Sequence, residues 1–203
     1  MFTNENIVVR RGLTEDAPDF ATFMLLSAPI FFPVIYGSGV GSVLQNLFRQ
    51  RKNLFSFEHS YFIEVDGKKA GVIIGYGWKT EREEEWRTGL LLIKHMKLGF
   101  FTKILSLLRA LSMGGRTKGD EYYISNVAVY PEFRGNHLGT NLLLKMEEEA
   151  KRHGAEKIAL DVKAGNQGAI KLYNRLSYSI VGESRRAKIN GESFAFFRMR
   201  KNL

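Results

Sequence analysis

The sequence predicts a single α/β domain of the α+β kind, with a mixed β-sheet and helices packed on it. Three observations support this. The chain has 203 residues and 44% hydrophobic content, which suits one globular domain. Asp66-Gly67 separates two apolar segments, a strong β-hairpin signal. Strand-like and helix-like apolar patterns alternate through the second half of the chain. We therefore expect one domain over residues 1–203 with no clear linker.

The first half predicts one strand, two helices and a hairpin. In chain order they are a strand at residues 7–10, a helix after Thr14, a helix at about residues 40–52, and strands at 61–65 and 70–77. Thr14 is a suitable residue to cap the first helix. Glu15 and Asp16 would then lie near the positive end of the helix dipole. Pro29 and Pro33 are expected to break this helix.

The second half alternates strands with helices. The expected elements are a strand at residues 122–130, a helix at 138–153, a strand at 158–162, a helix at 166–176, and final strands at 178–183 and 194–200. Gly154 follows the first of these helices, where a glycine commonly ends a helix. Asn190-Gly191 is expected to form the turn between the last two strands.

Residues 80–113 separate these halves. Residues 80–89 are highly charged and are expected to face solvent, whereas residues 90–113 are apolar, with no acidic residue and four lysines or arginines. We do not expect the segment to span a membrane, because each such charge near the bilayer centre costs about 2.5–3.5 kcal/mol. Three interpretations stay open: one or two helices packed on the domain, a substrate lid or dimer surface, and an interfacial membrane helix.

Composition narrows the function. The chain has no cysteine, and its four histidines are scattered, so we expect no metal site. The first residues lack the pattern of a signal peptide, which makes the cytoplasm the expected location. The formal net charge of +9 favours polyanionic partners. Nucleic acid is not expected among them, because the aromatic residues lie mostly in apolar runs and are not interleaved with basic residues.

The segment from Arg134 to Thr140 joins a predicted strand to a predicted helix and contains Gly135 and Gly139. A helix start leaves backbone N–H groups without partners and carries the positive end of the dipole. Small residues there would let a diphosphate approach the backbone closely. Two known phosphate loops do not fit, because the P-loop lysine and the G-x-G-x-x-G spacing are both absent. A plain strand–turn–helix is the alternative.

Two motifs resemble those of the GNAT superfamily of N-acetyltransferases. NVAVYPEFRGNHLGTNLLL is similar to its acetyl-CoA signature, [RQ]-x-x-G-x-[GA], with Arg134 and Gly139 at the two ends and His137 at the usual inner glycine. LDVKAGNQGAIKLYNRLSY resembles its second signature, in which Asn166, Ala169, Leu172 and Tyr173 match, and Ser177-Tyr178 replaces Gly-Phe. The resemblance covers about residues 122–183 and is nearest in motif to ribosomal-protein alanine acetyltransferases.

The resemblance implies a largely antiparallel central sheet flanked by helices, with a helical insertion at about residues 80–119 before the cofactor-binding strand. It also implies transfer of the acetyl group of acetyl-CoA to a primary amine, without a metal. The acceptor stays open: a protein N-terminus, a lysine, a polyamine or another small amine. The implied cofactor-binding residues are Val127, Ala128, Val129, Arg134, Gly135, Asn136, His137, Leu138, Gly139, Thr140, Asn166 and Tyr173.

The implied chemistry needs a base for the amine and an acid for the departing thiolate. Tyr173 is the candidate acid, and a tyrosine of the core is the alternative. Asp161 is the candidate base, because it falls where ribosomal-protein alanine acetyltransferases carry a catalytic glutamate. An aspartate on a solvated sheet face, or paired with a lysine, is its alternative, and Glu121 and Glu64 are weaker candidate bases. Two other functions compete: a non-catalytic acyl-CoA-binding module and a membrane-surface protein.

Overall fold

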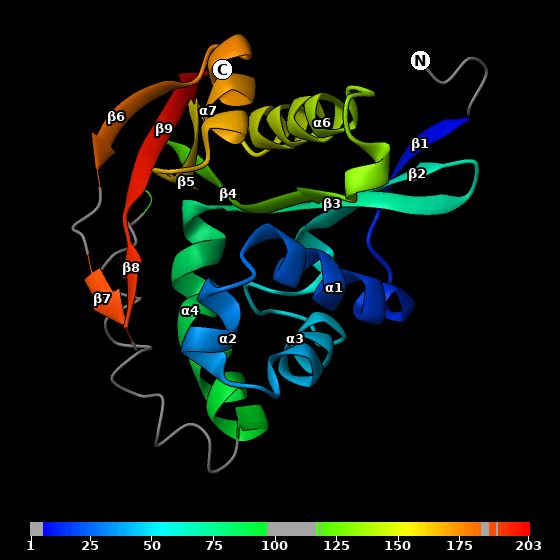
Figure 1. Ribbon diagram of the computed structural model, residues 1–203, viewed down its shortest axis with the longest axis vertical. Coiled ribbons are helices and arrows are strands. Elements are labelled where there is room, and N and C mark those ends of the chain that lie inside the picture. The colour runs from blue at the N-terminus through cyan, green and yellow to red at the C-terminus, as the bar shows by residue number, and fades with distance from the viewer. Residues whose placement is uncertain (1–5, 97–116, 118, 184–186, 190) are drawn as a thin grey trace.

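A seven-stranded sheet forms the centre of the fold, in the order β1-β2-β3-β4-β5-β9-β6 (Figure 1). The computed structural model describes residues 6–96, 117, 119–183, 187–189 and 191–203. The strands are β1 (Ile7–Arg11), β2 (Ser60–Val65), β3 (Lys68–Gly77), β4 (Glu121–Val129), β5 (Lys157–Lys163), β6 (Ser179–Glu183) and β9 (Phe196–Asn202). Among the described strands only β4 and β5 run parallel. The expected mixed and largely antiparallel sheet is therefore confirmed.

Helices cover both faces of this sheet (Figure 1). α6 (Leu138–Arg152) and α7 (Gln167–Arg175) lie on one face, and α1 (Ala17–Ser27), α2 (Phe31–Tyr36) and α3 (Val40–Phe48) lie on the other. Alternate strand residues supply the two cores, because successive side chains of a strand point to opposite faces. Ile63 and Ile73 pack in the cluster that includes α6, whereas Phe62 and Val72 pack in the cluster that includes α1.

The hairpin between β2 and β3 turns where the sequence predicts. Asp66 has φ 49° and Gly67 has φ 74°, so both lie in the left-handed region. A two-residue turn of type I′ requires positive φ at both central positions, and its twist suits the flanking strands. Asp66 also accepts the amide of Asn6 at 3.0 Å, which fixes the entry to β1 at the same point.

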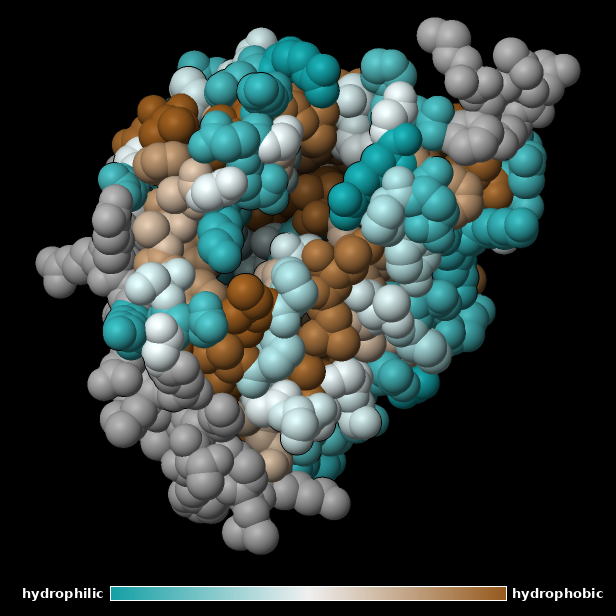
Figure 2. All heavy atoms as spheres, in the orientation of Figure 1, coloured by the Kyte–Doolittle hydropathy of each residue, from teal (hydrophilic) through white to brown (hydrophobic). Residues whose placement is uncertain are grey.

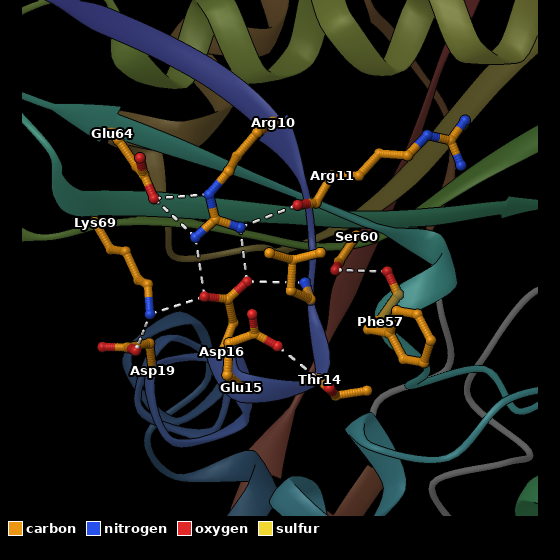
Figure 3. Close-up of polar contacts among 11 residues, drawn as sticks. Arg10, Arg11, Thr14, Glu15, Asp16, Asp19, Phe57, Ser60, Glu64 and Lys69 are labelled. Atoms are coloured by element: carbon orange, nitrogen blue, oxygen red, sulfur yellow. Dashed lines mark hydrogen bonds and ion pairs between the residues drawn. The ribbon is translucent and has the colours of Figure 1, made fainter.

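The start of α1 differs from the expectation that Thr14 caps it. Residues Thr14–Asp16 form a short 3-10 turn and α1 begins at Ala17. Asp16 controls this region: its carboxylate accepts the amide of Leu13 at 2.8 Å and pairs with Arg10 at 2.7 Å (Figure 3). The prediction was wrong because an ion pair with the sheet, which the local sequence does not reveal, places Asp16 at the helix entrance.

That ion pair belongs to a network that fastens α1 to the sheet (Figure 3). Arg10 of β1 also binds Glu64 of β2 at 2.7 Å, and Lys69 of β3 bridges Asp16 at 2.8 Å and Asp19 at 2.7 Å. The side chain of Asp16 is only 1% exposed. Burial alone would raise the pKa of Asp16, but hydrogen bonds from Arg10 and Lys69 hold it at about 2.

α3 is shorter than expected and ends at Phe48 rather than near residue 52. The buried side chain of Asn53 donates hydrogen bonds to the carbonyls of Leu47 at 2.9 Å and Gln50 at 2.7 Å. These bonds satisfy carbonyl groups that the end of a helix leaves without partners. The chain can therefore turn toward β2 one helical turn early.

The last strands also differ in one respect. β7 (Ala187–Ile189) and β8 (Glu192–Phe194) form a separate two-stranded sheet. Gly191, with φ 88°, lies in the turn of this small hairpin. The turn signal is therefore used within an additional hairpin and does not join the last two strands of the main sheet, β6 and β9, directly.

A single helix, α4 (Trp78–Met96), follows β3 and contains the charged stretch at residues 80–89, of which only Thr88 is buried. Leu91, Leu92 and Met96 pack against Val43 and Leu47 of α3. This agrees with the interpretation of a helix packed on the domain. Among the described helices, none is both long enough and apolar enough to cross a membrane. The predictions for residues 97–116 lie outside the described residues.

Candidate active site

β4 and β5 begin as neighbours and then separate. Their paired residues run from Glu121 and Lys157 to Ile124 and Leu160, although both strands continue further. A bulge marks the point of separation: Ile74 of β3 pairs with Asn126 and Gly75 pairs with Ile124, so Ser125 is the extra residue. A bulge bends its strand and sharpens the local twist. The sheet is therefore open between β4 and β5 beyond Ser125.

A cleft with two arms occupies this opening. The loop arm, about 530 Å³, runs along the end of β4 to the start of α6. The aromatic arm, about 730 Å³, lies between β4, β5, α2 and β9. Leu26, Ser27, Val127, Asn166, Ala169 and Tyr173 line both arms. Figure 2 shows the face of Figure 1 hollowed near its centre, with hydrophobic groups in and around the hollow.

The loop arm brings together the residues that the sequence predicted for cofactor binding. All of them line it except Asn136. Asn136 instead donates hydrogen bonds from its side chain to the carbonyls of Phe133 and Arg134, both at 3.3 Å, and so closes the turn. The guanidinium of Arg134 is exposed and donates to the carbonyl of Val129 at 3.2 Å.

Unpaired amides line the loop arm at the start of α6. The amide of Asn141 closes the first helical turn on the carbonyl of His137 at 3.0 Å. Within the described part of the chain, the amides of Leu138, Gly139 and Thr140 donate to no protein acceptor. Three such donors at the positive end of a helix dipole can donate hydrogen bonds to an anion such as a diphosphate.

His137 is the N-cap of α6 and has φ 60° and ψ 9°. This left-handed conformation is strained for a residue with a Cβ, whereas glycine adopts it freely. The conformation therefore explains why a glycine suits this position. Gly139 does not have positive φ, and a Cβ there would meet only Leu172 at 3.5 Å. Neither backbone conformation nor local space therefore requires glycine at residue 139.

Val127–Val129 form one wall of the loop arm. They pair with β3 on one side, where Ile73, Val72 and Gly71 are their partners, and no described strand pairs with them on the other side. Such an edge offers backbone donors and acceptors to an extended ligand. Asn166 stands opposite as the N-cap of α7, with its side-chain oxygen accepting the amide of Ala169 at 3.1 Å.

Tyr173 lies where the two arms meet and is 7% exposed. Burial raises the pKa of its hydroxyl to about 12. No hydrogen bond joins this hydroxyl to another described residue. The phenol therefore stays protonated at neutral pH and has a proton to donate into the cleft.

Asp161 lines the aromatic arm, and two groups hold its carboxylate. Arg198 of β9 lies 3.1 Å from Oδ2, and the hydroxyl of Tyr123 donates to the same oxygen at 3.0 Å. Burial raises the pKa of Asp161, and the partial offset comes from Arg198 and Tyr123. The partner is thus an arginine and not the lysine considered from the sequence.

The two weaker candidate bases lie elsewhere. Glu121 is buried at the other end of β4, where it pairs with Arg200 at 2.7 Å and Arg198 at 3.3 Å. Glu64 belongs to the Arg10 network. Neither of them lines the cleft.

Sequence reasoning did not identify Arg198, Tyr123 or the aromatic arm. Arg198 and Arg200 alternate along β9, which could have indicated two cations on one sheet face. The segment FFPVIY was interpreted only as a break, although it forms α2 and supplies Phe31, Phe32 and Tyr36 to the aromatic arm.

Comparison with known proteins gives a consistent result. The model of the acetyltransferase (GNAT) family matches residues 36–178. An uncharacterized N-acetyltransferase of Bacillus subtilis, YobR, is 37% identical over 60 residues, which are 30% of this chain and 24% of that protein. Four curated relatives are matched over only 24–48% of their own length.

Solved structures resemble the whole fold. An N-acetyltransferase from Staphylococcus aureus Mu50 has a TM-score of 0.70 at 21% identity, with 96% of this chain and all of that chain covered. The ribosomal-protein-S18-alanine N-acetyltransferase of Escherichia coli has a TM-score of 0.59 at 16% identity, covering 97% of this chain and 94% of that one. The second is a more distant structural neighbour than the first, so the structural comparison does not single out that branch.

Proposed function

The chain belongs to the acetyltransferase (GNAT) family, and we propose that it moves the acetyl group of acetyl-CoA to a primary amine. The observation that carries the proposal is the opening between β4 and β5, which continues directly into the unpaired amides at the start of α6. Enzymes of this family generally use acetyl-CoA. An extended arm and a diphosphate are the two features of that molecule that such an arrangement can hold.

In this proposal the loop arm holds the cofactor. The amides of Leu138, Gly139 and Thr140 bind the diphosphate, with Arg134 free to swing from the Val129 carbonyl toward it. The open edge of Val127–Val129 binds the pantetheine arm as a sheet edge binds a peptide. Asn166 and Tyr173 then face the arm from α7, where both line the cleft.

The chemistry takes place where the two arms meet. Asp161 accepts a proton from the ammonium group, directly or through a water, and leaves a neutral amine. The amine nitrogen then forms a bond to the thioester carbonyl carbon, the carbon–sulfur bond breaks, and the nitrogen gives up its second proton to solvent. Tyr173 donates its proton to the departing sulfur and regains one from solvent, so the products are an acetylated amine and free CoA. The raised pKa of Asp161 favours this role, because a stronger base takes the proton more readily.

The proposal extends to domain organisation. The main sheet and the helices that cover it share continuous cores, which supports a single domain over residues 1–203. We propose that residues 80–119 are an insertion before β4, to which most of α4 belongs. No described residue of α4 lines either arm of the cleft. This favours a role outside acceptor binding for α4.

The test is an assay of acetyl transfer. The protein is incubated with acetyl-CoA and a panel of primary amines, while thiol release and the mass of the amine are followed together. Transfer predicts release of one CoA for each amine that gains an acetyl group. Thiol release without any acetylated amine would mean hydrolysis and would contradict the proposal.

A non-catalytic acyl-CoA-binding module is the second candidate. It is favoured by one observation: Arg198 and Tyr123 already occupy the carboxylate of Asp161, as in a structural ion pair. Binding of acetyl-CoA without turnover of any amine would support this alternative.

The third candidate, a membrane-surface protein, has support in the exposed Trp86, Leu90 and Ile93 of α4. Failure to sediment with anionic liposomes at low salt would exclude it.

A further inference from the structure

Aromatic side chains form the far wall of the aromatic arm. Phe31 of α2 lies with its ring 5.5 Å from that of Phe194 and 6.0 Å from that of Phe196, both edge to face. Phe32 and Tyr36 of α2 line the same space, together with Phe55 from the segment between α3 and β2. Ile35 and Ile189 pack behind this wall and support it. The arm is therefore an apolar pocket whose shape is held by contacts between α2 and the end of the chain.

Formal charge is scarce in this pocket. Of the described residues that line the aromatic arm, only Asp161 and Lys163 carry a charge. Asp161 is already paired with Arg198, and Lys163 is exposed at the end of β5. A polyamine would bring at least two ammonium groups into the pocket. A second buried ammonium with no carboxylate to pair with would be costly to desolvate.

We infer that the acceptor is a primary amine joined by a short linker to an aromatic or branched apolar body. This rests on the proposed function, because it names the substrate class of the same site. The amine would lie at Asp161, near the junction with the loop arm, and the apolar body would fill the space against Phe31. A cavity of about 730 Å³ is within the usual size range of a small-molecule pocket.

The physical reason is a difference between the two ends of the pocket. At the inner end, the carboxylate and the hydroxyl of Tyr123 offer polar contacts to one nitrogen. At the outer end, the rings offer apolar and edge-to-face contacts but few polar partners. A ligand with one polar end and one apolar end satisfies both, whereas a linear diamine satisfies only the first.

The experiment compares 2-phenylethylamine, putrescine and spermidine as acceptors with the full chain and acetyl-CoA. We expect kcat/KM for 2-phenylethylamine to exceed that for either polyamine by about tenfold or more, since apolar pocket contacts give discrimination of this order. A higher kcat/KM for putrescine or spermidine would overturn the inference.

A variant tests the wall itself. Phe31→Glu places a carboxylate in the apolar part of the pocket, so it should lower kcat/KM for 2-phenylethylamine about tenfold and raise that for putrescine. The matched control is Ile180→Glu on β6, where the side chain is 49% exposed and lines neither arm. The control should keep the preference of the wild type. Equal effects of both variants, or an unchanged preference in Phe31→Glu, would contradict the inference.

Binding separates this inference from the proposed function. Calorimetry of the CoA-loaded protein with each amine needs no turnover. Tighter binding of 2-phenylethylamine than of putrescine, in a protein that acetylates neither, would support the pocket assignment and contradict the proposed transferase activity. Preferential acetylation of polyamines would support the proposed transferase activity and contradict the pocket assignment. Absence of both binding and turnover of 2-phenylethylamine would overturn the inference.

Discussion

The guanidinium of Arg198 lies 3.1 Å from the carboxylate of Asp161, at the point where β5 leaves β4 and faces β9. Arg198 also approaches Glu121 at 3.3 Å and lies over the ring of Tyr123, with its Cζ 4.8 Å from the ring centre. The guanidinium of Arg198 thus forms ion pairs with both Asp161 and Glu121. Asp161 is therefore held firmly in the cleft, and burial keeps its pKa raised.

The first prediction concerns the pH dependence of turnover. A base acts only when it is unprotonated, so kcat/KM should fall as the pH drops through the raised pKa of Asp161, which lies above the ordinary aspartate value of 3.8. Asp161→Asn should lower kcat/KM by about 10²-fold or more and remove this acidic limb. Pairs of pH–rate profiles, measured with the same amine, check it.

Tyr123→Phe provides the matched control for that profile. The hydroxyl of Tyr123 lowers the pKa of Asp161 by donating to its carboxylate. Its removal should therefore shift the acidic limb to higher pH and leave the limb present. A profile of Asp161→Asn that coincides with the wild type would exclude Asp161 as the base.

The second prediction concerns Tyr173. Tyr173→Phe should lower kcat by about 10²-fold or more, the usual effect of losing a general acid, with little change in acetyl-CoA affinity. Tyr178→Phe is a matched control. The ring centre of this buried tyrosine lies 6.0 Å from that of Tyr173, its side chain lines neither arm, and its hydroxyl donates to Glu147. It should reduce stability but not kcat. If Tyr173→Phe keeps full kcat, Tyr173 is a core residue only.

The third prediction follows from the backbone of His137. A left-handed conformation costs a residue with a Cβ about 1–2 kcal/mol, whereas glycine adopts it freely. His137→Gly should raise the free energy of unfolding by up to about 1 kcal/mol after the greater chain entropy of glycine is included. His137→Val should lower it by about 1 kcal/mol or more. Urea unfolding measures both, and a loss of stability in His137→Gly would show that the imidazole makes a stabilising contact.

The fourth prediction tests the unpaired amides. Gly139→Glu places a carboxylate against the site of the diphosphate, and charge repulsion should weaken acetyl-CoA binding by at least about tenfold. Folding should tolerate the change, because the site has room and an acidic residue suits the first turn of a helix. Gly41→Glu in α3, where a Cβ meets nothing within 4 Å, is the control and should bind normally. Equal affinity of the two variants would refute diphosphate binding here.

The fifth prediction concerns stability at low pH. The pKa of Asp16 is depressed in the folded protein to about 2, below its unfolded value of about 3.9. Its stabilising effect is therefore fully present above about pH 4 and is lost as the pH falls toward about 2. The unfolding free energies of the wild type and Asp16→Asn should converge over this interval.

At neutral pH, Asp16→Asn should cost about 2–3 kcal/mol, somewhat less than for a fully buried pair because Arg10 and Lys69 are partly exposed. Asp19→Asn is the control. Asp19 is 37% exposed and, within the described part of the chain, forms an ion pair only with Lys69, so removal of its charge should cost less than about 1 kcal/mol. A pH-independent difference between wild type and Asp16→Asn would contradict the assignment.

Much of the fold could be predicted because the decisive signals are local. The turn between β2 and β3 requires positive φ at two successive residues, and Asp-Gly is one of the few dipeptides that adopt this conformation readily. The apolar stripe of α6 and the glycine after it define that helix almost completely. The errors fall where a specific side-chain contact, and not a turn or periodicity signal, determines where a helix begins or ends. Thr14 does not cap α1 because Asp16 pairs with Arg10 of the sheet, and α3 ends early because Asn53 turns back on it.

The candidate site also has a part that the sequence could predict and a part that it could not. The loop at residues 134–140 is contiguous in sequence, so its residues could be predicted together. The environment of Asp161 could not, because Arg198 is 37 positions later and reaches it only through the pairing of β5 with β9. The aromatic arm joins α2 with Phe194 and Phe196 from the end of the chain, and sequence patterns carry no signal of such a contact.

Calorimetric titration with acetyl-CoA, with CoA, ATP and NAD as comparison ligands, decides whether the opening between β4 and β5 binds CoA. We expect acetyl-CoA and CoA to bind with a micromolar or lower Kd, ATP and NAD to bind much more weakly, and Gly139→Glu to remove the difference. No binding of acetyl-CoA or CoA, or equal binding of all four ligands, would contradict the assignment of the opening between β4 and β5 as a CoA site.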